Sequence, residues 1–371
     1  MSGITKKKYI AETMRYNKSI KRPLNLIAEV MPKEYNGRIL LQYFKKFYPR
    51  EWEHLVQMQK TYTEKDKFLL SIGKKARYKP LSPEEYFFSL PKVRNILSVS
   101  AKNKHGSLLS EEERKLKLEK LSNKRKSAID KHITKITNNT KLLQKIDPHY
   151  VDFYIAAYHQ KGIDIEGKME IVKDLSKYDS IKIDTFFYKL NDSERNNQIR
   201  GMAFDYLQRT GKYAKLRKRF KGKKKPYMIE TTCFEMAPED LYKRLHSSKI
   251  QMNKSFDVFI SHSYLDKEKI ITLFKSLNEK GVSCYCDWTN DNDFLKRNMA
   301  GKYTEEVLKK RIQQSTYFLY ADSDNSAKSK WVKFEIEYAK TIKKDIKIIN
   351  INNTAINDIQ SQISNLLNIK D

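Results

Sequence analysis

The most constraining feature of this sequence is an alternation of short apolar segments with amphipathic ones, which begins near residue 255. Apolar runs of strand length alternate with stretches whose apolar residues recur every three or four positions, as on one face of a helix. The predicted strands are 256–260, 282–288, 315–322 and 346–352, and the predicted helices are 266–280, 304–314, 327–340 and 357–367. Strands alternating with helices indicate a parallel sheet flanked by helices, which binds ligands at the carboxyl ends of its strands.

The first 250 residues follow a different pattern and are predicted to be mainly helical. Ser82 and Glu85 form a capping box around Pro83, a combination that marks the start of a helix. Ser110 and Glu113 repeat the capping box and open a helical pattern that extends to about residue 144. We therefore expect two regions, a mainly helical one at 1–250 and an α/β domain at 255–371.

The positive charge of the chain is concentrated in the helical region. The net charge is +29, of which +26 falls in residues 1–250 and +3 in residues 251–371. One interpretation is a surface that binds nucleic acid or another polyanion. The other is a compositional bias towards Lys, Asn and Ile on solvated helix faces. The densest basic run, 215–227, either binds phosphates or is a charged helix end followed by a loop.

Membrane and metal signals are weak in this sequence. No apolar run approaches the roughly 18 residues that a membrane span requires, and the N-terminus lacks a signal-peptide pattern. The three cysteines (Cys233, Cys284 and Cys286) are odd in number and lack the paired spacing of a zinc site. We expect a cytoplasmic protein with no membrane partner and no metal site.

The predicted helix 327–340 carries one residue that conflicts with its pattern. At about 100° per residue, its apolar side chains form one wide arc, and Glu335 lies near the centre of that arc. Glu337 lies on the polar side. Because an unpaired buried carboxylate is costly, Glu335 either reaches water or a lysine at the edge of the arc, or has a function in a partly dry cleft.

Four segments, in this order, resemble the TIR (Toll/interleukin-1 receptor) domain. They are FDVFISHSYLD, CYCDW, LYADS and SKWVKFEIEYA, and the resemblance is nearest to bacterial TIR proteins of antiphage systems such as Thoeris. It implies a flavodoxin-like parallel sheet and covers 255–371, leaving 1–250 without a family. A fifth strand is usual in such domains, and none is evident after residue 352, so the number of strands stays open.

The resemblance implies an enzyme that cleaves NAD+ at the nicotinamide–ribose bond, with Glu335 as the catalytic group. NAD+ is then the substrate, no separate cofactor is expected, and the product is ADP-ribose or a cyclic ADP-ribose isomer. It also implies self-association through TIR domains and, for a cyclic product, a downstream effector that senses the nucleotide. The trigger expected at residues 1–250 is a polyanion or a phage-derived molecule. The alternative is a non-catalytic TIR adaptor whose basic region binds nucleic acid.

The remaining candidates for substrate binding follow the strands or flank Glu335. Ser261, His262 and Ser263 follow the first strand, where they either contact ribose or phosphate or cap the next helix. By the resemblance, Asp287 and Trp288 begin the BB loop, which contacts substrate or a neighbouring TIR domain, although Trp288 could instead close the end of the sheet. The last two candidates are Tyr320, at the end of the third strand, and Trp331, as an aromatic wall beside Glu335.

Overall fold

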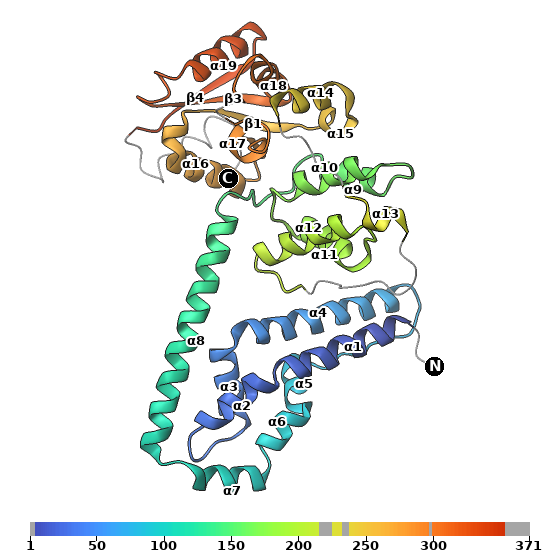
Figure 1. The fold of residues 1–371 in the computed structure, drawn as a ribbon, viewed down its shortest axis with the longest axis vertical. Helices are drawn as coiled ribbons and strands as arrows, with labels where there is room; N and C mark the ends of the chain where they lie inside the picture. The colour runs from blue at the N-terminus through green and yellow to red at the C-terminus, as the bar shows by residue number, and fades with distance from the viewer. Residues whose placement is uncertain (1–3, 215–224, 232–236, 297–298, 353–371) are drawn as a thin grey trace. The chain divides into compact units, whose positions relative to one another are not determined.

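The computed structural model describes residues 4–214, 225–231, 237–296 and 299–352 (Figure 1). The chain divides into two compact units, Met1–Lys135 and Ile136–Asp371. The helix α8 passes through this division. These units do not coincide with the predicted regions 1–250 and 255–371. The predicted boundary marks where the TIR resemblance begins, and it stays a prediction.

The first unit is made of helices with an apolar core of its own. Ser82 and Ser110 begin α5 and α8 with the predicted capping contacts to Glu85 and Glu113, so both predicted helix starts are confirmed. The helices are α1 (Ile4–Ser19), α2 (Lys21–Val30), α3 (Gly37–Phe47), α4 (Pro49–Ser71), α5 (Pro83–Ser89), α6 (Pro91–Ile96), α7 (Val99–Leu108) and α8 (Glu111–Thr140).

The second unit opens with further helices, as expected for the rest of the first 250 residues. They are α9 (Val151–His159), α10 (Ile165–Leu175), α11 (Ile181–Ser193), α12 (Asn197–Arg209), α13 (Pro226–Ile229), α14 (Pro238–Ser247) and α15 (Lys249–Met252). Most of the basic run 215–227 lies outside the described residues.

The predicted parallel sheet follows these helices. Its strands are β1 (Phe256–Ser261), β2 (Cys284–Tyr285), β3 (Ser315–Asp322) and β4 (Asp345–Asn350), in the order β2-β1-β3-β4. Every pairing is parallel, with Val258 opposite both Cys284 and Tyr317. The predicted fold class is confirmed for both parts of the chain. The predicted helix 357–367, and any strand after β4, lie outside the described residues.

Helices cover both faces of the sheet (Figure 1). One face packs against α16 (Lys267–Glu279) through the side chains of Val258 and Ile260. The other face, which includes Phe259 and Phe318, packs against α18 (Lys302–Gln313) and α19 (Lys330–Thr341). Ser261 is in phase with Phe259 along β1 and therefore points to the α19 side. The short helices η1 (Tyr264–Asp266) and α17 (Asp287–Asn290) follow β1 and β2.

The helices α9–α12 share an apolar core with the sheet. Tyr150 packs edge-on against Phe256 of β1, with ring centroids 6.0 Å apart, and both rings are buried. The same core includes Tyr285 of β2 and Phe318 of β3. Among the described helices, none has the length and apolar character needed to cross a membrane.

Candidate active site

Glu335 lies on the buried face of α19, as its position in the apolar arc predicted. The helix begins after Ser329, whose hydroxyl accepts a hydrogen bond from the backbone N–H of Val332. Val332, Glu335 and Ala339 are the buried positions of this helix, and Glu335 is only 7% exposed. The alternative in which the carboxylate reaches water at the edge of the arc does not hold.

The carboxylate of Glu335 is hydrogen-bonded to the last residue of β1. The hydroxyl of Ser261 donates to Oε2 of Glu335 at 2.6 Å, and Ser261 is fully buried. Burial raises the pKa of Glu335 to about 8, although the Ser261 hydrogen bond opposes this rise, and the nearby Asp287 raises the pKa further. An approaching cation would favour the ionised form, so this group is suited to stabilising positive charge.

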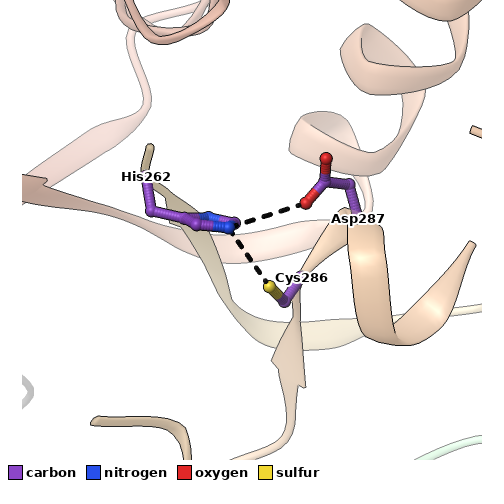
Figure 2. A group of neighbouring side chains, drawn as sticks. All are labelled: His262, Cys286 and Asp287. Atoms are coloured by element: carbon purple, nitrogen blue, oxygen red, sulfur yellow. Dashed lines mark hydrogen bonds and ion pairs between the residues drawn. The ribbon is translucent and has the colours of Figure 1, made fainter. Parts of the chain in front are cut away.

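His262 lies next to the ends of both β1 and β2 (Figure 2). Its Nε2 is 3.7 Å from Sγ of Cys286 and 3.8 Å from Oδ1 of Asp287. The indole N–H of Trp288 donates to the same nitrogen. Nδ1 lies 3.0 Å from the carbonyl oxygen of Ile260, which assigns the proton to Nδ1 and leaves Nε2 as an acceptor.

The parallel sheet explains why these residues meet. β1 and β2 are neighbours, so the residues that follow them emerge at the same edge of the sheet. Ser261 and His262 come from the end of β1, and Asp287 and Trp288 come from the segment after β2. Glu335 approaches the same edge from α19. Five of the predicted site residues thus form one cluster, and their roles in binding and catalysis stay predictions.

The other three candidates have structural contacts in this chain. The hydroxyl of Ser263 accepts a hydrogen bond from the backbone N–H of Leu265, so it caps η1 rather than the predicted helix that follows, α16. The hydroxyl of Tyr320 donates to Asp322 at 3.0 Å. Trp331 is 36% exposed and packs edge-on against Phe334. A role for these three in substrate binding stays a prediction.

Comparison with known proteins identifies the family of this chain. The TIR domain family matches residues 258–366. A protein of Cytobacillus dafuensis named "Putative cyclic ADP-D-ribose synthase TIR2" is 48% identical over 355 residues, which cover 96% of this chain and 94% of that protein. The chain belongs to the TIR-domain family. The resemblance stated from the sequence is confirmed.

Two further relatives match over shorter parts. The "Probable 3' cyclic ADP-D-ribose synthase ThsB'" of Bacillus cereus (strain MSX-D12) is 35% identical over 106 residues, 29% of this chain and 54% of that protein. The "Probable 2' cyclic ADP-D-ribose synthase TcpO" of Methanobrevibacter olleyae is 33% identical over 85 residues, 23% of each chain. Among solved structures, the comparison found no significant match.

Sequence reasoning missed how α17, the predicted start of the BB loop, is held in place. The side-chain oxygen of Asn290 accepts from the backbone N–H of Cys286 at 3.0 Å, which closes α17 around Asp287 and Trp288. The side-chain amide of Asn290 donates to the Tyr178 hydroxyl at 3.3 Å, and Lys177 donates to its carbonyl oxygen. The segment after α10 therefore positions the helix that carries two candidate substrate contacts.

A buried ion pair lies directly after α17. Nε of Arg311 donates to Oδ2 of Asp291 at 2.8 Å, and both side chains are almost fully buried. The hydroxyl of Tyr285 also donates to Asp291, and Arg311 donates to the side chain of Gln251. Burial alone would raise the pKa of Asp291, but Arg311, Lys254 and Lys177 together hold it well below its usual range. The TIR domain and the helices before it thus share one charged network.

Proposed function

We propose that this chain is a TIR enzyme that cleaves NAD+ at the nicotinamide–ribose bond and forms a cyclic ADP-ribose isomer. The observation that carries the proposal is the buried carboxylate of Glu335, which accepts a hydrogen bond from the hydroxyl of Ser261 at the carboxyl end of β1. The names of the three relatives, each a cyclic ADP-D-ribose synthase, support the reaction class and the cyclic product.

The chemistry of the bond explains why one carboxylate is sufficient. When the bond between C1' of the ribose and the nicotinamide nitrogen breaks, the electron pair stays on nitrogen, and nicotinamide leaves as a neutral molecule. Positive charge then develops on the ribose, where an ionised Glu335 in a site with little water stabilises it. Attack on C1' by a nucleophilic atom of the same molecule gives the cyclic product, and attack by water gives ADP-ribose. We propose no separate cofactor for either step.

The Glu335→Gln variant tests this proposal. Glutamine keeps the shape of the side chain and removes its charge, so we expect nicotinamide release from NAD+ to fall by about 100-fold or more. Product masses from the full chain distinguish the cyclic isomer from ADP-ribose, which is heavier by one water. Glu337→Gln, on the exposed side of the same helix, is the matched control and should keep full activity. Glu335→Gln activity within a few-fold of wild type would overturn the assignment.

We also propose a role in antiphage defence inside the bacterial cytoplasm, where the cyclic product activates a separate effector. The resemblance to TIR subunits of Thoeris systems supports this role, and it implies that TIR domains of neighbouring chains associate. A phage challenge of bacteria that express the chain with its neighbouring genes tests the role. Glu335→Gln should abolish protection, and equal protection by wild type and variant would contradict a catalytic signal.

The second candidate function is a non-catalytic module whose basic region binds a polyanion. The net charge of +26 in residues 1–250 favours such binding, which could also act as the trigger of the enzyme. If phosphates are bound, affinity for duplex DNA should fall steeply between about 50 and 200 mM salt. An adaptor predicts that Glu335→Gln retains biological function, whereas the enzyme proposal predicts its loss. Binding that is absent at low salt would contradict the polyanion surface.

A further inference from the structure

Three side chains of different chemistry converge beside Glu335. His262, Cys286 and Asp287 each present one possible metal ligand, and these ligand atoms lie within 4.8 Å of one another (Figure 2). They come from the ends of β1 and β2 and from the start of α17, so the sheet itself brings them together. Nitrogen, sulfur and oxygen donors in one place suit a borderline-soft ion such as Zn²⁺ better than Mg²⁺ or Ca²⁺.

The two distances from the His262 nitrogen to the other ligand atoms are close to what a tetrahedral ion requires. Bonds of about 2.3 Å to sulfur and about 2.0–2.1 Å to nitrogen and oxygen place neighbouring ligand atoms roughly 3.3–3.6 Å apart. The measured separations are 3.7 Å from His262 Nε2 to Cys286 Sγ and 3.8 Å from His262 Nε2 to Asp287 Oδ1. The third separation, from Cys286 Sγ to Asp287 Oδ1, is within 4.8 Å, so closing the site requires side-chain movements of up to about an ångström.

One ligand atom is left without a hydrogen bond. Oδ1 of Asp287 is buried and has no hydrogen-bond partner among the described residues, although it points towards His262. Leaving a buried acceptor unsatisfied costs free energy, and a cation between the two side chains would remove that cost. This unsatisfied oxygen adds a second observation to the proximity of the three side chains.

The surroundings of the ligands also fit an ion. The Ile260 carbonyl oxygen accepts from Nδ1 of His262, which fixes the ring and directs the Nε2 lone pair into the cluster, as second-shell partners of metal-bound histidines do. Burial raises the pKa of the Cys286 thiol, while the Thr289 hydroxyl and the Trp288 backbone N–H act in the opposite direction, so an ion that binds here has to displace the thiol proton. The indole of Trp288 would have to turn away from Nε2, and its ring is only partly buried.

We propose that His262, Cys286 and Asp287 form a Zn²⁺-binding site with an open fourth position. A thiolate and a carboxylate together neutralise the two charges of the ion, which permits binding in a largely buried place. Three protein ligands and one open position resemble zinc sites that exchange a water molecule. This inference departs from the sequence-based expectation of no metal, and it does not rest on the proposed reaction.

Metal titration of the tag-free full chain tests the site. With Co²⁺ as a probe, a sulfur-to-cobalt charge-transfer absorption should appear in the near ultraviolet and saturate at one equivalent. Zn²⁺ should displace Co²⁺ and abolish this absorption. Zn²⁺ should also raise the unfolding temperature of the chain in proportion to the logarithm of its concentration above Kd. Neither measurement uses NAD+, so a failure here is distinct from a failure of the proposed enzyme activity.

Cys284, a second buried cysteine two residues before Cys286, provides the matched control. In a Cys233→Ser background, Cys286→Ser should abolish the charge-transfer absorption, whereas Cys284→Ser should retain it, because both cysteines are buried but only Cys286 faces His262. Asp287→Asn, at a partly exposed position, should weaken Zn²⁺ binding at least tenfold without unfolding the chain. The proposal would be overturned if the wild-type chain does not bind Zn²⁺, or if the Cys286→Ser or Asp287→Asn variant binds it as tightly as wild type does.

Discussion

Two buried carboxylates of the TIR domain lie in opposite surroundings. Asp291, after α17, is enclosed by Arg311 and two lysines, which hold its pKa well below its usual range. Glu335, at the mouth of the sheet, has a serine hydroxyl as its partner, and burial raises its pKa to about 8. Burial is nearly the same for both, so the partner decides the charge state. Asp291 is therefore paired with cations of the protein itself, whereas Glu335 remains available to a cationic ligand.

Breaking the ion pair between Asp291 and Arg311 should have the largest effect on stability. Arg311→Met leaves Asp291 buried without its main partner, and we expect the free energy of unfolding to fall by about 3–5 kcal/mol. Urea unfolding followed by tryptophan fluorescence measures this change. In a Trp52→Phe background the remaining tryptophans, Trp288 and Trp331, both report on the second unit.

The double variant separates the pair from its neighbours. Asp291→Asn with Arg311→Met removes both charges, so its loss of stability should be smaller than the sum of the two single losses. Lys254 and Lys177 would then lack one of their acidic neighbours, which is why we expect a residual loss. Additive losses, or a loss below about 1 kcal/mol for Arg311→Met, would contradict the ion pair as the main link.

Replacing the Glu335 carboxylate should increase the free energy of unfolding, whereas breaking the Asp291–Arg311 ion pair should lower it. Between pH 4.5 and about 8 the folded protein binds the Glu335 proton more tightly than the unfolded chain does, so this group lowers stability as pH rises. Glu335→Gln removes that cost, and its free energy of unfolding should exceed that of wild type by about 1–3 kcal/mol at pH 8. The difference should shrink towards pH 5. A difference that does not change with pH would contradict a raised pKa.

The hydroxyl of Ser261 should tune the same group by a smaller amount. Its hydrogen bond lowers the pKa of Glu335, so Ser261→Ala should raise that pKa and shift the rising limb of kcat/KM for nicotinamide release to higher pH. We expect a shift of about half a unit to one unit, equivalent to about 1 kcal/mol. Ser276→Ala, at a buried position of α16, should leave the limb unchanged. A limb that does not move, or moves to lower pH, would exclude this hydrogen bond as the cause.

The same comparison shows what the sequence could predict. The alternation of strands with helices, and the parallel sheet that it implies, followed from local hydrophobic patterns, and Glu335 was found because one carboxylate interrupted an apolar arc within a single helix. β2 is shorter than predicted because Asn290 accepts from the backbone N–H of Cys286 and begins the turn into α17. Such a contact depends on a side-chain geometry that periodicity does not encode.

The charged network was beyond prediction for a different reason. Lys177 reaches the carbonyl oxygen of Asn290 across 113 residues of sequence, and Arg311 meets Asp291 across 20. Neither pair has a characteristic spacing, and lysine and aspartate are common throughout this chain. The triad of His262, Cys286 and Asp287 also required the sheet, because only the pairing of β1 with β2 brings its members together.

An exposed ion pair provides the smallest expected effect and completes the comparison. Lys141 contacts Glu268 of α16 at 2.8 Å, the same distance as between Arg311 and Asp291, but Glu268 is exposed and Lys141 is partly exposed. Solvent screens such a pair, so Lys141→Ala should leave the urea midpoint of the second unit unchanged within error. A loss as large as that of Arg311→Met would mean that contact distance, rather than burial with a partner, determines how firmly the helices hold the TIR domain.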